Sequence, residues 1–212
     1  MSALKDQSFM ELTGRIAVIP VLTIEQVTDA VPIVAALVSR GLNVLEITMR
    51  TECALEAVAR VSSEVPEAVV GVGSVIERAQ FAAARRVGAR FAVSPGATAE
   101  LEAGARAEEI PWLPGAQSVS EVLALRERGC RFVKFFPAQS SGGLDFLRSI
   151  IGPVPDMAFC PTGGITAETA RDYLALPNVA CVGGSWLTPP LLVKNKNWNE
   201  IGLLAERTHG LR

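Results

Sequence analysis

Short apolar runs recur along this chain at intervals of 20 to 28 residues, and this spacing constrains the fold more than any other feature of its 212 residues. Most of the runs are apolar at nearly every position, which is typical of strands buried on both faces of a parallel sheet. We therefore predict strands at 16–22, 44–47, 69–72, 91–93, 112–113, 132–136, 158–160 and 180–182.

The segments between most of these runs have the periodicity of helices. Apolar residues recur every three or four positions, the spacing that forms one face of an α-helix, in 26–40, 52–65 and 76–87. Thr51 before Glu52 indicates a helix start, and Ser118 with Glu121 has the spacing of a capping box. Glycines at 41, 88 and 129 indicate helix ends.

One strand and one helix, repeated about eight times, predict an α/β fold, namely a (β/α)₈ TIM barrel. We expect a single domain over 1–212, because no linker, charge block or low-complexity tract divides the chain. A short N-terminal helix at 6–13 should precede the first strand, and a helix at 198–207 should close the chain. A doubly wound open sheet is the alternative, because periodicity alone does not show closure.

Charge and length of the apolar runs exclude two classes of partner. Lys and Arg number 20 against 22 Asp and Glu, so there is no basic excess to hold a nucleic-acid backbone. No apolar run reaches 18 residues, and the first 15 residues mix charges without an apolar core. We therefore expect no membrane span and no signal peptide.

Histidine and cysteine usage narrows the chemistry. The single histidine, His209, lies near the C-terminus, which leaves no histidine-rich metal site and no nucleophile–histidine–acid triad in the body of the chain. The four cysteines, at 53, 130, 160 and 181, are widely spaced and form no CxxC pair. Free thiols in a reducing cytoplasm are the favoured interpretation.

Lys134 interrupts an apolar strand in the segment RFVKFFPA. Burial disfavours the ammonium form, so a lysine between Val133 and Phe135 is a candidate amine nucleophile that could form a Schiff base with a ketone. The alternative is a lysine at a strand end whose stem packs while its charged head reaches water.

Alternate residues of an extended strand share one face, so Glu46, Thr48 and Arg50 should form one column in VLEITMRTE. The carboxylate could move protons, and the guanidinium could hold a substrate carboxylate. A structural Glu–Thr–Arg network is an equally good interpretation of this segment taken alone.

Glycine motifs follow several of the predicted strands. PTGGI (161–165) and VGGSW (182–186) end the seventh and eighth strands, where barrels commonly bind phosphate through backbone N–H groups. GVGS (71–74), SPGA (94–97) and LPG (113–115) end the third, fourth and fifth strands. Each of these motifs could also serve only to make a turn.

Taken in order, GLNVLEITMRTE, GVGS, SPG, LPG, VKFFPA, FCPTGGI and VGGSW resemble the 2-keto-3-deoxy-6-phosphogluconate (KDPG) and 4-hydroxy-2-oxoglutarate aldolase family over about 15–186. The resemblance implies a metal-free class I aldolase without a cofactor, usually a homotrimer on a (β/α)₈ barrel. Its substrates would be a small keto acid and a phosphorylated aldehyde.

Carried over by motif, Lys134 resembles the Schiff-base lysine of the family and Glu46 its proton-transferring carboxylate. Arg50 and Ser74 match positions that bind the keto-acid end, and Pro95 and Phe136 match residues that shape the pocket. The positions that match the phosphate end are Thr162, Gly163, Gly164, Gly184 and Ser185.

The chain departs from the family pattern at a few places. Ser74 stands where a threonine is usual, Ser118 and Val119 replace Thr and Pro, and the tail after Trp186 matches poorly. These departures concern acceptor preference more than reaction class. The expected reaction is KDPG cleavage to pyruvate and glyceraldehyde 3-phosphate, with 4-hydroxy-2-oxoglutarate as a second substrate. The alternatives are the phosphogalactonate epimer, a phosphate-binding isomerase, or a non-catalytic binding protein on the same scaffold.

Overall fold

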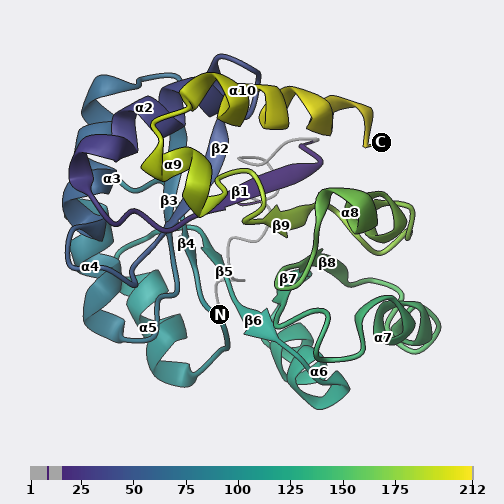
Figure 1. The fold of residues 1–212 in the computed structure, drawn as a ribbon. Coiled ribbons are helices and arrows are strands. Elements are labelled where there is room, and N and C mark those ends of the chain that lie inside the picture. The colour runs from purple at the N-terminus through teal and green to yellow at the C-terminus, as the bar shows by residue number, and fades with distance from the viewer. Residues whose placement is uncertain (1–8, 10–15, 212) are drawn as a thin grey trace.

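Strands and helices alternate along the chain in the computed structural model, which describes residues 9 and 16–211 (Figure 1). The strands are β1 (Val18–Leu22), β2 (Val44–Thr48), β3 (Val69–Gly73), β4 (Ala92–Val93), β5 (Trp112–Leu113), β6 (Gly115–Ala116), β7 (Phe132–Phe135), β8 (Ala158–Pro161) and β9 (Val182–Gly184). The helices are α2 (Val27–Val38), α3 (Ala54–Glu64), α4 (Arg78–Arg86), α5 (Ala99–Ala107), α6 (Val119–Glu127), α7 (Gly143–Ile150), α8 (Ala167–Leu174), α9 (Pro190–Lys194), α10 (Trp198–Glu206) and the 3-10 helix η1 (Arg207–Gly210). The helix predicted at 6–13 lies outside the described residues except for Phe9, which is helical.

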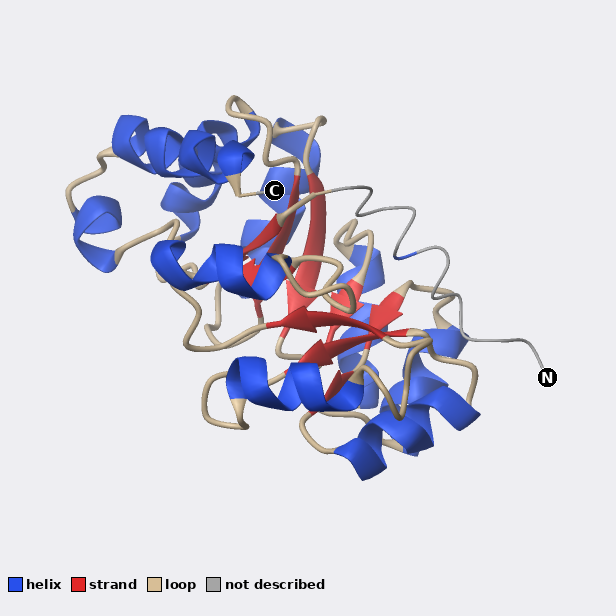
Figure 2. Ribbon diagram, turned by 90° about the vertical axis from the view of Figure 1, so that its right-hand side faces the viewer, coloured by secondary structure: helices blue, strands red, loops and turns tan. Residues whose placement is uncertain are grey.

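Hydrogen bonds join the strands into two parallel sheets. One has six strands in the order β5-β4-β3-β2-β1-β9, and the other has three in the order β6-β7-β8. The strands lie in the middle of the molecule with helices outside them (Figure 2). Helices α2–α5 lie beside the larger sheet and α6–α8 beside the smaller one (Figure 1). Neighbouring strands follow the chain order without a reversal, so the doubly wound alternative is not observed.

The prediction of one closed (β/α)₈ barrel is wrong. The strands form a curled six-stranded parallel sheet and a separate three-stranded sheet instead of one continuous ladder. The strand predicted at 112–113 ends at Leu113, and Gly115–Ala116 forms a separate strand of the other sheet. The ladder is interrupted at two places, and each interruption has a local cause.

The first interruption is at Pro114, which separates β5 from β6. Proline has no backbone N–H and so cannot donate to a neighbouring strand. Its carbonyl still accepts the Lys134 N–H at 2.8 Å, which ties the start of β6 to β7. Gly115 then approaches the Pro95 backbone so closely that any side chain at 115 would overlap it.

The second interruption lies between β8 and β9, which are linked only by the isolated bridges Phe159↔Val179 and Thr162↔Gly183. Between these bridges one strand advances by three residues and the other by four. The extra residue cannot be paired, as in a β-bulge, so no regular ladder forms here.

The helix boundaries confirm most of the local signals. Ser118 and Glu121 form the predicted capping box at the start of α6. Gly41, Gly88 and Gly129 adopt positive φ angles of 82°, 88° and 94° just beyond α2, α4 and α6. The predicted start at Thr51 is wrong, because its hydroxyl donates to the Ile24 carbonyl at 2.7 Å and α3 begins at Ala54.

Buried apolar side chains form two clusters, one on each face of the strands. The larger cluster packs strand residues such as Val18 and Leu22 against the helices. The smaller one, which we call the inner cluster, consists of Phe9, Ile19, Val44, Phe91, Val93, Leu113, Phe132, Cys160 and Cys181. Because Val44 belongs to one sheet and Phe132 to the other, the inner faces of the two sheets pack against each other.

Three aromatic rings fill much of the inner cluster. The Phe9 ring meets the Phe91 ring edge-on with centroids 5.1 Å apart, and its centroid lies 5.7 Å from that of Phe132. Gly71 faces the Phe91 ring closely, and a side chain there would overlap it. The cluster is therefore packed, and it closes the space between the sheets below the carboxyl ends of the strands.

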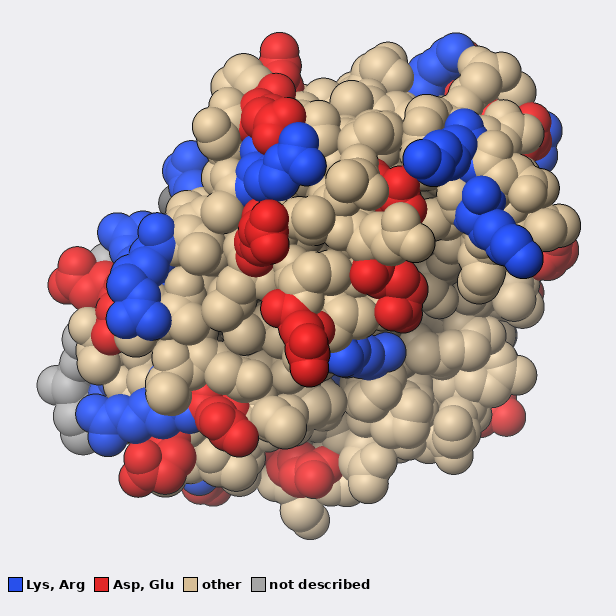
Figure 3. Space-filling view, turned by 60° about the vertical axis from the view of Figure 1, so that its left-hand side comes forward, with Lys and Arg blue, Asp and Glu red and all other residues tan. Residues whose placement is uncertain are grey.

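Positive and negative side chains are interspersed on the face formed largely by α2–α5 (Figure 3). Pairs such as Arg60–Glu64 at 2.7 Å and Arg78–Glu100 at 3.6 Å account for part of this pattern. Among the described helices, none has both the length and the apolar character needed to cross a membrane.

Phe91→Ala should lower the free energy of unfolding by about 3–5 kcal/mol, because it leaves a cavity between the Phe9 ring and Gly71. Urea denaturation followed by circular dichroism measures this change. Leu191→Ala is the control, since Leu191 is 67% exposed and its truncation should change stability by less than about 0.5 kcal/mol. Equal effects of the two substitutions would contradict the packing described here.

Candidate active site

A layer of polar and small residues lies one step above the inner cluster. Side chains two positions apart on a strand share a face, so the residues two positions after Val44 and Phe132 point toward the same space. These residues are Glu46 on β2 and Lys134 on β7. The same step leads from other members of the inner cluster to Val21, Gly115, Thr162 and Gly183.

Lys134 and Glu46 form a buried ion pair between the two sheets. Lys134 Nζ donates to Glu46 Oε1 at 3.2 Å, and the two residues are only 4% and 3% exposed. The lysine head therefore does not reach bulk water, and the alternative of a strand-end lysine with a solvated head is not observed. An amine and a carboxylate in contact can exchange a proton directly.

Two neighbouring residues shape the space around this pair. The Phe136 ring centroid lies 5.3 Å from Lys134 Nζ, within the range of a cation–π contact. Gly73 lies directly against the Glu46 carboxylate, and a side chain at 73 would overlap it. The sequence analysis missed this role of Gly73, although its place at the end of a strand beside Glu46's strand was a signal that could have shown it.

Arg50 and Ser74 form a second polar pair at the ends of β2 and β3. Arg50 Nε donates to Ser74 Oγ at 2.9 Å. Ser74 has a φ of 59°, a conformation uncommon for a residue with a side chain and often found at functional sites. Ser74 directly follows Gly73, so this pair lies close to Glu46.

The predicted column of Glu46, Thr48 and Arg50 is only partly observed. Strand β2 ends at Thr48, and Arg50 lies in the turn that follows. Thr48 Oγ1 donates to the Leu22 carbonyl at 3.1 Å, whereas Glu46 bonds Lys134 and Arg50 bonds Ser74. A self-contained Glu–Thr–Arg network is therefore not what the structure shows.

Pro95 lies on the opposite side of the lysine strand. The Pro95 backbone touches Gly115, and Gly115 pairs in register with Lys134. Half-buried Pro95 and Phe136 thus lie on either side of the pair's surroundings. Their positions agree with the prediction that they border a pocket, and their roles toward a ligand remain predictions.

The two glycine motifs predicted to bind phosphate are brought together. Thr162 pairs with Gly183, and a side chain at Gly183 would overlap that of Thr162. Gly163 and Gly164 adopt φ angles of 99° and 78°, which few other residues could adopt. Gly184 ends β9 and Ser185 is exposed directly after it.

The start of α8 is already satisfied by its own residues. Thr166 caps it, with a capping box to Thr169. A hydrogen bond with Thr166 holds the pKa of the Glu168 carboxyl below its ordinary value, which keeps a negative charge in the first turn. An anion would therefore be met by the Gly163–Gly164 turn and not by the end of this helix.

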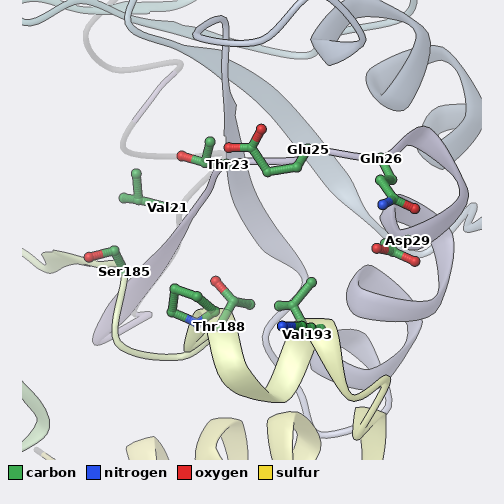
Figure 4. A pocket seen from close by; sticks show the side chains of 10 residues that line it. Val21, Thr23, Glu25, Gln26, Asp29, Ser185, Thr188 and Val193 are labelled. Carbon is green, nitrogen blue, oxygen red and sulfur yellow. The ribbon is translucent and has the colours of Figure 1, made fainter.

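A pocket of about 470 Å³ adjoins Ser185 (Figure 4). We call it the β1–α9 pocket, because it is lined by the end of β1, the turn into α2, Ser185 and α9. Thr23, Glu25 and Asp29 contribute oxygen atoms to it, and Lys194 contributes an amine. These residues were missed by the sequence analysis, although Thr23 and Glu25 directly follow the first predicted strand.

No three His, Cys, Asp or Glu side chains gather as a metal-binding group in the part of the chain that the structure describes. The side chains that do gather are an amine, a carboxylate, a guanidinium and a hydroxyl. This set can form a Schiff base with a ketone, transfer protons at it and hold an acidic group beside it.

The pair Lys134 and Glu46 should be energetically coupled, because either single substitution leaves its buried partner without a counter-charge. Urea unfolding of Lys134→Met, Glu46→Gln and the double variant forms a double-mutant cycle. We expect a coupling free energy of about 0.5–3 kcal/mol. Effects that add to within about 0.3 kcal/mol would contradict a direct interaction.

Comparisons with known proteins agree with this arrangement. The family model "KDPG and KHG aldolase" matches residues 10–204. A 2-dehydro-3-deoxy-phosphogluconate aldolase from Pseudoalteromonas atlantica is 45% identical over 190 residues, covering 90% of this chain and 88% of the relative. A KHG/KDPG aldolase from Escherichia coli is 45% identical over 188 residues, covering 89% of this chain and 88% of the relative.

A solved structure of KDPG aldolase from Legionella pneumophila contains pyruvate captured at low pH as a covalent carbinolamine intermediate. It is 44% identical in sequence and superposes with a TM-score of 0.89, covering 92% of this chain and 94% of that one.

Proposed function

This chain belongs to the KDPG and KHG aldolase family, and we infer from that membership and from the buried Lys134–Glu46 pair that it is a metal-independent class I aldolase. It is a lyase that cleaves 2-keto-3-deoxy-6-phosphogluconate to pyruvate and glyceraldehyde 3-phosphate. The observation that carries the assignment of residues is the 3.2 Å contact between the amine and the carboxylate. A phosphate-binding isomerase would not need an amine at this position.

Lys134 is the nucleophile in this proposal. Transfer of its proton to Glu46 leaves a neutral amine, which attacks the C2 ketone and forms a carbinolamine. Glu46 returns the proton to the C2 oxygen, which leaves as water, and a protonated imine remains. No new charge has to enter the buried site, because the proton moves within the pair.

Glu46 also serves the carbon–carbon cleavage. As a carboxylate it takes the proton of the C4 hydroxyl, the C3–C4 bond breaks and its electron pair moves into the imine. Glyceraldehyde 3-phosphate leaves with a new aldehyde group, and the enamine on Lys134 is protonated at C3. Hydrolysis then releases pyruvate and restores the amine. One carboxylate in contact with the amine can perform these steps in turn.

The remaining residues hold the two ends of the substrate. Arg50 and Ser74 bind the carboxylate beside the ketone, for which a guanidinium is well suited. Pro95 and Phe136 border the reacting carbons. The phosphate is held by Thr162, Gly163, Gly164, Gly184 and Ser185, whose glycines let backbone N–H groups approach an anion.

We expect the chain to act in the cytoplasm as a homotrimer, as its family resemblance implies. Its four cysteines are free thiols, which suits a reducing compartment. The exposed apolar side chains of Ile76, Val119, Leu123 and Leu191 offer surface for contacts between subunits. Light scattering of the purified protein would measure the assembly.

Pyruvate followed by borohydride should leave a stable adduct on Lys134, because reduction of the imine makes the bond permanent. Peptide mapping by mass spectrometry identifies the modified residue. Lys134→Met should lose both the adduct and the cleavage of 2-keto-3-deoxy-6-phosphogluconate. Lys196→Met is the matched control, since Lys196 is exposed and should leave the adduct unchanged. Activity that survives Lys134→Met would overturn the mechanism.

Glu46→Gln should reduce kcat by about 10²–10⁴-fold with a much smaller change in KM, because the amide cannot transfer protons but keeps nearly the same shape. Steady-state cleavage assays measure both constants. Glu127→Gln, at the exposed end of α6, provides the control. Unchanged kcat in Glu46→Gln would remove the role assigned to this carboxylate.

A further inference from the structure

The β1–α9 pocket continues the active site beyond the residues proposed to hold phosphate. Ser185 belongs to both, because it follows the phosphate-binding Gly184 and also lines the pocket (Figure 4). Val21, on the opposite wall, pairs in register with Glu46. Thr23 lies in the same wall, and its Oγ1 is 3.1 Å from Thr48 Oγ1 on the strand that carries Glu46.

The charged groups of this pocket have no partner of their own. Within the described part of the chain, Glu25, Asp29 and Lys194 form no side-chain ion pair or hydrogen bond. Figure 4 shows the Asp29 carboxylate and the Thr188 hydroxyl on facing walls. Asp29 also lies in the first turn of α2, where a negative charge is favoured, but this does not account for Glu25 in the preceding turn.

The charge of the lining decides which ligand fits. Two carboxylates against one ammonium give the pocket a net charge of −1, which disfavours a second phosphate. Carboxylates accept hydrogen bonds from hydroxyl groups, and Thr23 and Thr188 can donate or accept. A volume of about 470 Å³ is ample for one or two hydroxylated carbons.

The segment that builds one wall of the pocket is also where this chain departs from its family's pattern. Thr188, Pro190, Val193 and Lys194 all follow Trp186, after which the match to the family motifs is poor. The reacting pair and the phosphate turns lie before that point. The pocket is thus a place where acceptor preference can differ while the reaction is kept.

We propose that the β1–α9 pocket binds the hydroxyl groups of a longer aldehyde tail, so that this aldolase also condenses pyruvate with neutral polyhydroxylated aldehydes of four or five carbons. The proposal rests on the proposed function. The enamine on Lys134 forms a bond from its C3 to the aldehyde carbon, the aldehyde oxygen takes a proton from Glu46, and water releases the longer keto acid. The tail then passes Ser185 and places its hydroxyl groups against Glu25 and Asp29.

The test compares two acceptors in the condensation direction, D-erythrose and glyceraldehyde 3-phosphate, by kcat/KM for pyruvate consumption. The double variant Glu25→Gln/Asp29→Asn should lower the ratio of erythrose to glyceraldehyde 3-phosphate by about tenfold or more, because it loses two charged acceptors. Thr188→Trp, which fills the pocket without removing a charge, should lower the ratio as well. Glu127→Gln should leave the ratio at its wild-type value.

Two results would overturn the proposal while leaving the proposed function intact. One is a wild-type enzyme that traps pyruvate on Lys134 but does not consume it with D-erythrose. The other is a ratio that neither the double variant nor Thr188→Trp changes. A preference for erythrose 4-phosphate over erythrose that depends on Lys194 would also contradict it. Failure to trap pyruvate on Lys134 would instead remove the proposed function itself.

Discussion

An ammonium and a carboxylate buried together hold the key position in this molecule, because each can remain charged only in the company of the other. Removing either ion from water costs several kcal/mol, and a close counter-charge offsets much of that cost. Lys134 comes from the three-stranded sheet and Glu46 from the six-stranded one. The pair therefore forms only when both sheets are folded and correctly placed.

The surroundings of the pair follow from this requirement. The inner cluster below it excludes water and is filled by aromatic rings. Glycines at 73 and 115 remove side chains that would displace Glu46 or push Pro95 from the lysine strand. Small residues thus create the space for substrate directly above a tightly packed layer. The same alternation along each strand produces both the packing and the reactive site.

Local chemistry in this chain was readable from sequence, and long-range geometry was not. Lys134 was identified because a charge within an apolar strand is exceptional, and the capping box at Ser118 follows from residue spacing. Closure of the sheet was wrongly predicted, because strand spacing does not reveal that Pro114 separates β5 from β6 or that one residue bulges before Gly183. Arg50 was placed on the column of Glu46 because the strand was assumed to continue, whereas the chain turns after Thr48. The partner of Glu46 lies 88 positions away, a distance that no local pattern spans.

The carbonyl of Pro114 accepts the backbone N–H of Lys134 at the boundary where one sheet ends and the other begins. The amine is thereby anchored at a joint, while its carboxylate partner stands on the far side of that joint. A small drift between the two halves of the molecule would separate the reacting groups before either half lost its own hydrogen bonds. Activity in such an arrangement reports on alignment, and it should fade on gentle heating earlier than the signals of helix and strand.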